Sequence, residues 1–503
     1  MGAVINSRRL SRATVSGKAA TGVTALLVGD SRTAQNYVLH YIASISRTAG
    51  IVTVKFIGSA LDAPFPYLWK TCPVQVENVP EDVRGKRFIL DGAGSTWRFE
   101  APGPDFAEYT PPGTPHVMNQ AHYASNGWFV RMNARAMQKF DLVDIVASVG
   151  RGTDEIATTR LAEATASKAE VAFLWAGIND IMNVIPRPAA EILANLKTTA
   201  LALKASGKRV FLFCEMPLYG ANNTAARALV ISQLNQGIRK FVRDTPGLDL
   251  VDIYRALVDP TATATGAARQ YMLATDNLHP CAYGADEIAK VGIAATAGIP
   301  LVDTRVTSVL ETYGASALNT NVLDSAPFAA GAVDVPYAGS QVGAGYAGFK
   351  ENNSGAVFSV VDRADGMGKI NRVTYTPTAN GDGARWLSAN INGARVKNNM
   401  RVYSETTVKT TGAAGGVVKM PRHYLMITLA GGAGSAAVSA MSEVETNSLY
   451  QPREDVELFL RTPAVTLATA PTNLYALTGL ASWSAGAAVT FDMSLCKIDV
   501  KAA

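Results

Sequence analysis

Between residues 169 and 298, short apolar runs alternate with longer segments in which apolar residues recur at helical spacing. The apolar runs predict strands over residues 169–180, 209–217 and 248–254, and the longer segments predict helices over residues 189–207, 224–244 and 282–298. Strands that alternate with amphipathic helices form a parallel sheet, because each crossover helix packs back onto a face of that sheet. This pattern therefore predicts an α/β fold with helices on both faces of the sheet.

The same pattern begins near the N-terminus but is interrupted. An apolar strand ends at Gly29-Asp30-Ser31, and residues 33–46, which contain no Pro or Gly, are predicted to form a helix. Residues 47–109 consist instead of short alternating segments separated by Pro, Gly and Asp, which predict a small β insertion over about residues 47–112. A helix over residues 127–140 and a strand over residues 141–150 then return the chain to the α/β layer.

Beyond about Thr304 the helical spacing disappears, and Gly, Ala, Thr, Asn and Val dominate. Short alternating segments recur between turns without a strict repeat, which favours an all-β sandwich or jelly roll over a β-helix or propeller. The predicted organisation is therefore an N-terminal segment over residues 1–21, an α/β domain over residues 22–303 and a β-sandwich over residues 304–503.

Composition excludes several other classes of protein. Of the 503 residues, 48% are hydrophobic and 17% charged, as in globular proteins, and no apolar run is long enough to cross a bilayer, so we expect a soluble protein. The net charge of +5, with no Lys or Arg block, is not typical of a protein that binds nucleic acid or an anionic membrane. The four cysteines, Cys72, Cys214, Cys281 and Cys496, are too widely spaced to predict a zinc site or a dense disulfide framework.

A serine stands where the first predicted strand ends. Ser31 would lie at the carboxyl end of a parallel strand, which is where open α/β sheets place ligands. The predicted helix after it would offer unpaired N–H groups and a partial positive charge to an oxyanion. Gly-Asp-Ser is also a common composition of turns and helix caps, so Ser31 needs further evidence before it is taken as a nucleophile.

Three other segments contain groups that a serine nucleophile needs. Asp276 and His279, in "DNLHP", can form a hydrogen-bonded pair in which His279 is the base, although a His beside Pro also ends ordinary loops. Asn179, in "WAGIND", can aim its amide at developing negative charge or can cap the next segment. Gly150 and Gly152, in "ASVGRGTDEI", would let a backbone N–H approach a substrate closely, or would simply form a turn.

Together these segments resemble the four sequence blocks of the SGNH (GDSL-like) hydrolase superfamily. The blocks carry a Ser in Gly-Asp-Ser, a Gly, an Asn in Gly-x-Asn-Asp and a His in Asp-x-x-His, and they fit Ser31, Gly152, Asn179 and His279 in chain order. Gly150 also fits the second block, but the Gly-Thr pair at residues 152 and 153 favours Gly152. The resemblance covers about residues 22–300 and implies a flavodoxin-like three-layer sandwich.

This chain departs from the pattern of the superfamily in two ways. Arg32 stands directly after Gly-Asp-Ser, where a leucine or a small polar residue is commoner. In addition, roughly 120 residues separate the first two blocks, which is far more than an ordinary loop contains. The insertion between them is predicted to shape the substrate cleft.

The resemblance implies a serine esterase mechanism. Ser31 would attack an acyl carbonyl, His279 would take the hydroxyl proton and return it to the leaving alcohol, and Asp276 would hold the imidazole tautomer. The backbone N–H groups of Ser31 and Gly152 and the side chain of Asn179 would bind the oxyanion. The mechanism requires neither a metal nor an organic cofactor.

Other motifs lack the context that their chemistry requires. Residues 343–348, "GAGYAG", spell the dinucleotide-binding pattern, but they lie in the predicted β region and are predicted to form a loop. His116 and His122 have no nearby Cys or carboxylate pattern, and neither HExxH nor GxSxG occurs in the sequence. A zinc protease and a hydrolase of the nucleophile-elbow type are therefore disfavoured.

The appended β-sandwich favours a carbohydrate substrate, although the superfamily also cleaves fatty acyl esters, thioesters and phospholipids. Exposed aromatic rings on such a domain stack on sugars, whereas buried ones belong to the core. The candidates are Trp386, Tyr403, Tyr450, Tyr475 and Trp483. We therefore predict a carbohydrate O-acetylesterase acting on an acetylated polysaccharide or oligosaccharide, with a lipid or broad short-chain esterase as the alternative.

The setting of this activity is predicted from a second, looser resemblance. The N-terminal residues lack the apolar core of a secretory signal, and the β insertion and the Ala-, Gly- and Thr-rich sandwich resemble bacteriophage tail or tailspike modules. This resemblance implies a virion- or prophage-associated protein, commonly a trimer, that acts outside the cell after lysis. A cytoplasmic protein and a non-catalytic polysaccharide-binding tail protein are the alternatives.

Overall fold

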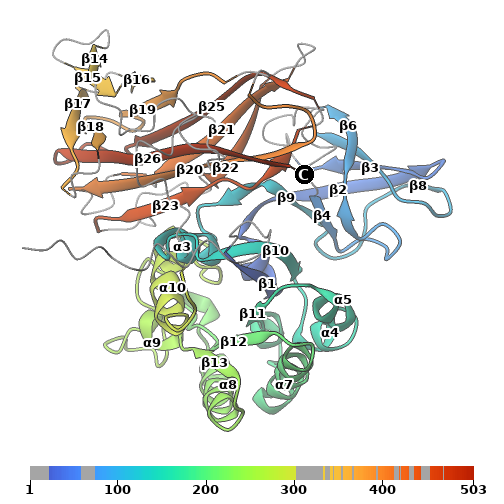
Figure 1. Cartoon of the computed structure of the whole chain (residues 1–503). Helices are drawn as coiled ribbons and strands as arrows, with labels where there is room; N and C mark the ends of the chain where they lie inside the picture. Colours follow the sequence, from blue (N-terminus) through green and yellow to red (C-terminus); the bar gives the residue numbers. More distant parts are fainter. Residues whose placement is uncertain are drawn as a thin grey trace, which may run out of the picture.

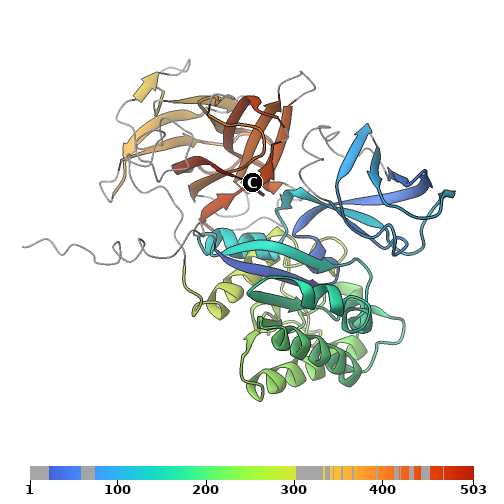
Figure 2. The same ribbon diagram turned by 45° about the vertical axis from the view of Figure 1, so that its right-hand side comes forward.

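The computed structural model describes most of the chain between residues 22 and 502. The described residues are 22–57, 74–93, 95–301, 332–334, 340–343, 345–352, 355–364, 368–391, 395–412, 418–419, 421–429, 435–442, 454–467 and 469–502. They form an α/β layer and two β regions, which both lie on the same side of that layer (Figures 1 and 2).

The α/β layer is built on a five-stranded parallel sheet of order β10-β1-β11-β12-β13. Its strands are β1 (Val23–Gly29), β10 (Phe140–Ala147), β11 (Val171–Trp175), β12 (Arg209–Phe213) and β13 (Leu248–Val251). All residues of β11 are buried, because helices cover both faces of the sheet.

Two hydrophobic cores separate the sheet from its helices. Alternate residues of β1 point to opposite faces, so Leu27 packs with α3 (Trp128–Arg135) and α10 (Ala282–Ala295), whereas Leu26 packs with α7 (Ala189–Ala205) and α8 (Ala225–Arg243). The remaining short helices of this layer are α4 (Thr153–Ala157), α5 (Leu161–Ala166), α6 (Ile178–Met182), α9 (Tyr254–Leu257) and the 3₁₀ helix η2 (Gly220–Asn222). The predicted three-layer α/β sandwich is therefore confirmed.

The helix predicted over residues 33–46 is wrong. Helix α1 spans only Ser31–Ala34, and strand β2 (Tyr37–Thr48) follows it. Strand β2 pairs with β3 (Ile51–Phe56) on one side and with β9 (His116–Ala124) on the other. Pairing with a distant strand therefore outweighs the local helical spacing.

Strands β2 to β9 form the β insertion, a name used here for residues 37–124. It also contains β4 (Val74–Glu77), β5 (Gly85–Arg87), β6 (Ile89–Ala93), β7 (Thr96–Glu100) and β8 (Phe106–Tyr109). Strands thus extend on both sides of the residues 47–112 that the sequence suggested, because β2 and β9 flank the predicted segments and pair with each other.

The C-terminal part is all β, as predicted. Strands β16 (Tyr346–Glu351), β19 (Gly383–Ser388), β25 (Pro471–Ala481), β21 (Arg422–Leu429) and β22 (Ser435–Ser442) form one sheet, in that order. A second sheet contains β17 (Val357–Asp362), β18 (Lys369–Tyr375), β26 (Val489–Ala502), β20 (Met400–Thr411), β23 (Glu457–Arg461) and β24 (Val465–Thr466). Phe358 of the second sheet and Trp386 of the first belong to one core, as in a sandwich.

The "GAGYAG" segment lies within this β region. Its first residue, Gly343, ends β15 (Gln341–Gly343), which pairs with β14 (Ala332–Asp334), and its last residues belong to β16. Residue 344 lies outside the described residues. The segment therefore has no strand-to-helix context in which it would bind a dinucleotide.

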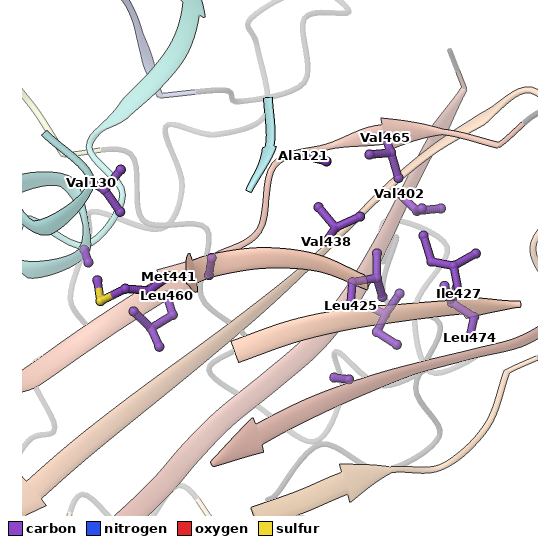
Figure 3. Close-up of a cluster of buried hydrophobic side chains, with 14 of the residues drawn as sticks. Ala121, Val130, Val402, Leu425, Ile427, Val438, Met441, Leu460, Val465 and Leu474 are labelled. Atoms are coloured by element: carbon purple, nitrogen blue, oxygen red, sulfur yellow. The ribbon is translucent and has the colours of Figure 1, made fainter. Parts of the chain in front are cut away.

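The β insertion and the first C-terminal sheet are one continuous sheet. Strand β22 pairs in parallel with β9, where Ser439 lies opposite His122 and Ser442 opposite Ala124. Figure 3 shows Ala121 of β9 and Val130 of α3 in the same cluster of buried side chains as Val438 and Met441 of β22. The two β regions therefore share a hydrophobic core as well as a sheet.

Candidate active site

Three neighbouring strands bring the first three predicted blocks to one edge of the parallel sheet. Gly29, at the end of β1, lies opposite Ala147 of β10 and Trp175 of β11. The loops that follow these strands contain Ser31, the two candidate glycines and Asn179. They are adjacent at the carboxyl edge of the sheet, where ligands bind in open α/β folds.

Ser31 is the first residue of α1 and lies close to His279. Asp30 caps this short helix, since its side chain accepts a hydrogen bond from the backbone N–H of Arg32 over 3.1 Å. The Ser31 hydroxyl is 2.7 Å from Nε2 of His279, and only 3% of Ser31 is exposed. The Ser31 hydroxyl therefore lies in a largely enclosed position, within hydrogen-bond distance of His279.

Asp276 orients His279 from within the same turn. Its Oδ2 is 2.6 Å from the imidazole Nδ1, and its Oδ1 accepts the backbone N–H groups of Leu278 and His279 over 2.9 and 3.0 Å. Because a carboxylate accepts the Nδ1 proton, Nε2 is left with its lone pair facing the Ser31 hydroxyl. Ser31, His279 and Asp276 thus form a hydrogen-bonded series.

The carboxyl of Asp276 is poised to remain ionised. Burial acts to raise its pKa, but the hydrogen bond and charge of His279 and the backbone N–H groups of His279 and Leu278 outweigh it, so the pKa of Asp276 lies below its ordinary value. An ionised carboxylate at this position can stabilise a positive charge that forms on His279.

Asn179 is joined to the loop that contains both candidate glycines. This residue belongs to α6, and its Nδ2 donates to the carbonyl oxygen of Arg151 over 2.8 Å. Gly150 adopts a left-handed conformation with φ of +79°, and Gly152 caps α4 with φ of −83°. A Cβ atom on Gly152 would lie 2.6 Å from a carboxylate oxygen of Asp154 and 2.9 Å from one of the buried Asp180, so a larger residue would clash with these side chains.

Arg32, the residue after Ser31, lies in a buried ion network. Its guanidinium contacts Asp30 over 2.8 Å and Glu215 over 3.0 Å, and it lies 4.3 Å above the ring of Trp175. Burial acts to lower the pKa of Arg32, but the two carboxylates outweigh it, so the guanidinium stays charged. Arg32 therefore helps to hold the segment that contains Ser31.

Glu215 is a member of this network that the sequence analysis missed. It follows the buried strand β12 and is itself buried. Two features of the sequence could have indicated this pair. Glu215 is a carboxylate that closely follows an apolar strand, and Arg32 is an unusual residue directly after Gly-Asp-Ser, so each would need a buried partner of opposite charge.

Two partly exposed tyrosines lie near the Asp276 loop, a name used here for residues 276–280. Tyr41 of β2 is 40% exposed, and burial together with the negative charge of Asp276 raises its pKa. Tyr219 is 38% exposed and precedes η2, whose Asn222 donates to the carbonyl oxygen of Asp276 over 2.9 Å. The β insertion and the α/β layer thus each bring one aromatic ring near the site.

The aromatic residues predicted to contact sugar lie in different surroundings. Trp386 and Tyr403 are buried in the C-terminal core. Their prediction as sugar contacts is therefore wrong, because their rings pack against other side chains and are not exposed to a ligand. Tyr475 and Trp483 are half-buried, and Tyr450 lies outside the described residues.

The described part of the chain contains neither a cluster of metal ligands nor a candidate membrane-spanning helix. Within it, no group of three His, Cys, Asp or Glu side chains is arranged to hold a metal. No helix among the described residues combines the length and hydropathy needed to cross a bilayer. Among the described residues, Cys214, Cys281 and Cys496 are buried and not disulfide-bonded, and Cys72 lies outside the described residues.

Comparison with solved structures returns proteins of low identity and low TM-score. A carbohydrate esterase family 3 protein from Talaromyces cellulolyticus is 19% identical, with 35% of this chain and 91% of that chain covered and a TM-score of 0.28. A GDSL-like lipase from Bacteroides thetaiotaomicron VPI-5482 is 18% identical, covering 35% and 83%, with a TM-score of 0.28. An α/β hydrolase from the metagenome of Lake Arreo, Spain, is 17% identical, covering 56% and 98%, with a TM-score of 0.32.

Comparison with protein families identifies the α/β domain. Residues 103–286 match the model of the GDSL-like Lipase/Acylhydrolase family, and this range includes Gly152, Asn179, Asp276 and His279 but begins after Ser31. None of the curated proteins matches the chain. The predicted resemblance is confirmed over these residues: residues 103–286 match the GDSL-like lipase/acylhydrolase family of ester hydrolases.

Proposed function

We propose that this protein is a serine esterase that removes O-acetyl groups from a carbohydrate. The observation that carries the proposal is the series Ser31–His279–Asp276, with contacts of 2.7 and 2.6 Å. Ser31 attacks the acyl carbonyl while Nε2 of His279 accepts the hydroxyl proton, and Asp276 stabilises the imidazolium through Nδ1. His279 then gives that proton to the leaving alcohol, and water hydrolyses the acyl-enzyme.

The oxyanion of the tetrahedral intermediate is bound by the backbone N–H groups of Ser31 and Gly152 and by the Asn179 amide, with Gly150 as the alternative to Gly152. One of the two Asn179 N–H bonds donates to Arg151, which fixes the amide orientation and leaves the second N–H for the oxyanion. Each such donor contributes about 3 kcal/mol to transition-state stabilisation.

The surroundings of Ser31 support a short acyl group. The serine is almost fully enclosed, and its neighbours Asp30 and Arg32 are buried and charged. A long alkyl chain would need open, apolar space next to Ser31, and these enclosed, charged neighbours do not provide it. An acetyl group requires much less space.

The two tyrosines support a carbohydrate as the leaving part of the substrate. Tyr41 and Tyr219 are large amphipathic rings near the Asp276 loop, and each is partly exposed. Such rings bind ligands that combine apolar faces with hydroxyl groups, as sugars do.

A second candidate, a broader short-chain or lipid esterase, is favoured by an exposed apolar pair in the segment that follows α6, the helix that contains Asn179. Val184 and Ile185, just after α6, are 100% and 83% exposed. Arg227 donates to the carbonyl oxygens of Met182 and Asn222 over 3.2 and 3.3 Å, which links this pair to the Asp276 loop. Exposed apolar residues beside an active site suit a longer acyl chain.

The setting of the enzyme is also part of the proposal. The C-terminal β-sandwich would bring the esterase to an acetylated polysaccharide, with the half-buried Tyr475 and Trp483 as candidate contacts. This organisation is the one expected of a virion- or prophage-associated tail protein that acts outside the cell, as the sequence resemblance implied.

The experiment compares hydrolysis of p-nitrophenyl acetate, butyrate and octanoate, and acetate release from acetylated polysaccharides, by the wild type, Ser31→Ala and His279→Ala. We expect activity on acetyl esters that falls at least about 10³-fold in both variants. Ser206→Ala, at the end of α7, is the matched control and retains activity.

Other results would redirect the proposal. Equal or faster hydrolysis of octanoate, still dependent on Ser31, would favour the second candidate. Binding of a polysaccharide by a wild type that hydrolyses none of these esters would contradict an enzyme and indicate a binding protein.

A further inference from the structure

We propose that Asn78 of the β insertion is a positioning residue for the oxyanion hole. It acts through the glycine loop, a name used here for residues 148–152, which contains both candidate glycines. This inference rests on the proposed function, because only an esterase needs the loop to present an N–H group to an oxyanion.

The side chain of Asn78 is hydrogen-bonded to the glycine loop on both sides of Gly150. Its Nδ2 donates to the carbonyl oxygen of Val149 over 2.7 Å, and its Oδ1 accepts from Nε of Arg151 over 2.7 Å. The same Nδ2 also donates to the carbonyl oxygen of Thr114 over 2.8 Å, within the β insertion. One amide thus joins the β insertion to the residues that flank Gly150.

Glu77, the preceding residue, anchors the start of the loop. Its buried carboxylate accepts the Ser148 hydroxyl over 2.9 Å and two guanidinium N–H groups of Arg160 over 2.9 and 3.0 Å. A buried carboxylate that is paired and hydrogen-bonded in this way resists movement, because any displacement would leave it without compensation. The end of β4 is therefore a firm support for Asn78.

The opposite side of the glycine loop is held by the segment after β11. Asn179 donates to the Arg151 carbonyl over 2.8 Å, and the Thr153 N–H donates to Asp180 over 2.8 Å. Arg151 therefore contacts Asn78 through its side chain and Asn179 through its carbonyl. A shift of Arg151 would move both the glycine loop and the Asn179 amide, which are the proposed oxyanion donors.

The left-handed backbone of Asn78 allows its side chain to be removed by mutation to Gly without straining the backbone. Asn78 has φ of +57°, a left-handed conformation that Asn and Gly tolerate. Asn78→Gly therefore keeps this conformation while removing the side-chain hydrogen bonds to Val149, Arg151, Ser148 and Thr114. Asn399, in the C-terminal part, has the same φ of +57° and is exposed, so Asn399→Gly is a matched control.

The test measures kcat and KM for p-nitrophenyl acetate, together with amide hydrogen exchange of residues 148–153 and thermal unfolding, in full-length wild type, Asn78→Gly and Asn399→Gly. We expect kcat to fall about 10- to 100-fold in Asn78→Gly, with KM within about twofold, because misplaced donors weaken transition-state binding rather than substrate binding. Exchange of residues 148–153 should accelerate in Asn78→Gly alone, and Asn78→Gly should unfold at a lower temperature than Asn399→Gly but stay fully folded at the assay temperature.

A conservative variant sharpens the result. Asn78→Asp keeps an acceptor for Arg151 but turns an oxygen toward the carbonyl oxygens of Val149 and Thr114, which repel it, so its kcat should fall at least as far as that of Asn78→Gly. Unchanged kcat, or unchanged exchange of residues 148–153, in Asn78→Gly would overturn the inference. So would a loss of activity that only follows a lower unfolding temperature.

Failure of the proposed function gives a different result. A wild type without Ser31-dependent ester hydrolysis would contradict the esterase and, with it, the oxyanion role of Asn78. Hydrogen exchange would then still report separately whether Asn78 orders the glycine loop.

Discussion

Asp276 contacts His279 twice, through the backbone N–H at 3.0 Å and through the imidazole Nδ1 at 2.6 Å. One carboxylate thus fixes both where the histidine lies in the chain and how its ring is turned. The consequence is that a single turn selects the tautomer that presents Nε2 to Ser31.

Asp276→Asn should lower kcat about 10²- to 10⁴-fold, because the amide can donate to Nδ1 and favour the wrong tautomer. The Asn side-chain oxygen can still accept the backbone N–H of His279, so the unfolding temperature should change little. Asp362→Asn, at a largely exposed carboxylate, is the control. Kinetics with p-nitrophenyl acetate decide the outcome, and retention of near wild-type kcat would contradict an orienting role.

Arg32→Met should destabilise the protein by about 3–5 kcal/mol, because it leaves the buried carboxylates of Asp30 and Glu215 without their cation. The comparison is Arg209→Met, which breaks a partly exposed pair with Asp249 and should cost at most about 1 kcal/mol. Urea unfolding of the two variants measures both free energies. Equal losses would show that the network around Arg32 contributes no more than a surface pair.

Gly284→Ala should destabilise α10 even though Ala normally favours a helix by about 1 kcal/mol over Gly. A Cβ atom at residue 284 would lie 1.9 Å from the carbonyl oxygen of Met272, so the start of α10, just after His279, would have to move. We expect a loss of about 2 kcal/mol and lower esterase activity.

Gly292→Ala, in the same helix, is the control for this steric argument. Its Cβ would meet the Met132 side chain, with Sδ 2.5 Å away, rather than backbone, so a change of side-chain rotamer can relieve the clash and the loss of stability should be smaller than in Gly284→Ala. Thermal unfolding and ester hydrolysis of both variants are the measurements. Stabilisation by Gly284→Ala would contradict the tight packing of this helix start.

His423 should make the protein less stable in acid. Its ring is buried between the Thr478 and Ser404 hydroxyls, each at 2.9 Å, and burial lowers its pKa from 6.5 to about 3. Below pH 6.5 the unfolded chain binds a proton at this histidine that the folded chain does not. The free energy of unfolding is therefore not reduced by His423 well above pH 6.5, and it falls as the pH decreases from 6.5 toward 3. Between pH 6.5 and 4.5 the loss should reach about 2 kcal/mol.

Urea unfolding from pH 7.5 to 4.5, in wild type and His423→Gln, separates this effect from carboxylate titration. The variant cannot take up the proton, so its stability should fall less steeply over the same range. If the free energies of unfolding of the two proteins fall in parallel with pH, His423 takes up its proton in the folded protein as readily as in the unfolded chain, which would contradict this prediction.

The sequence allowed correct prediction of those elements whose pattern is local. Helix α7 and strand β11 were expected because their apolar spacing reflects burial against a sheet covered on both faces. Residues 33–46 were misjudged because β2 is stabilised by pairing with β9, which no local pattern reveals. Long-range pairing sets the secondary structure there.

The candidate site was predictable to the extent that strand ends are. Ser31 and His279 are 248 residues apart, yet both follow from motifs placed where the α/β architecture gathers loops. The contact between Arg32 and Glu215, 183 residues apart, depends on the relative placement of two neighbouring loops. In the sequence, only the unusual Arg32 after Gly-Asp-Ser indicated it. The contacts of Asn78 with the glycine loop likewise needed three-dimensional structure.

The pairing of β9 with β22 also sets the order in which the molecule can be completed. During synthesis, the edge of β9 at His122–Ala124 emerges long before Ser435–Ser442, the strand that covers it. Until then the nascent chain presents an unpaired strand edge of the kind that invites association with other chains. A chain ending before residue 435 would keep every proposed catalytic residue and still lack the partner that closes this edge, so its weakness would be solubility rather than chemistry.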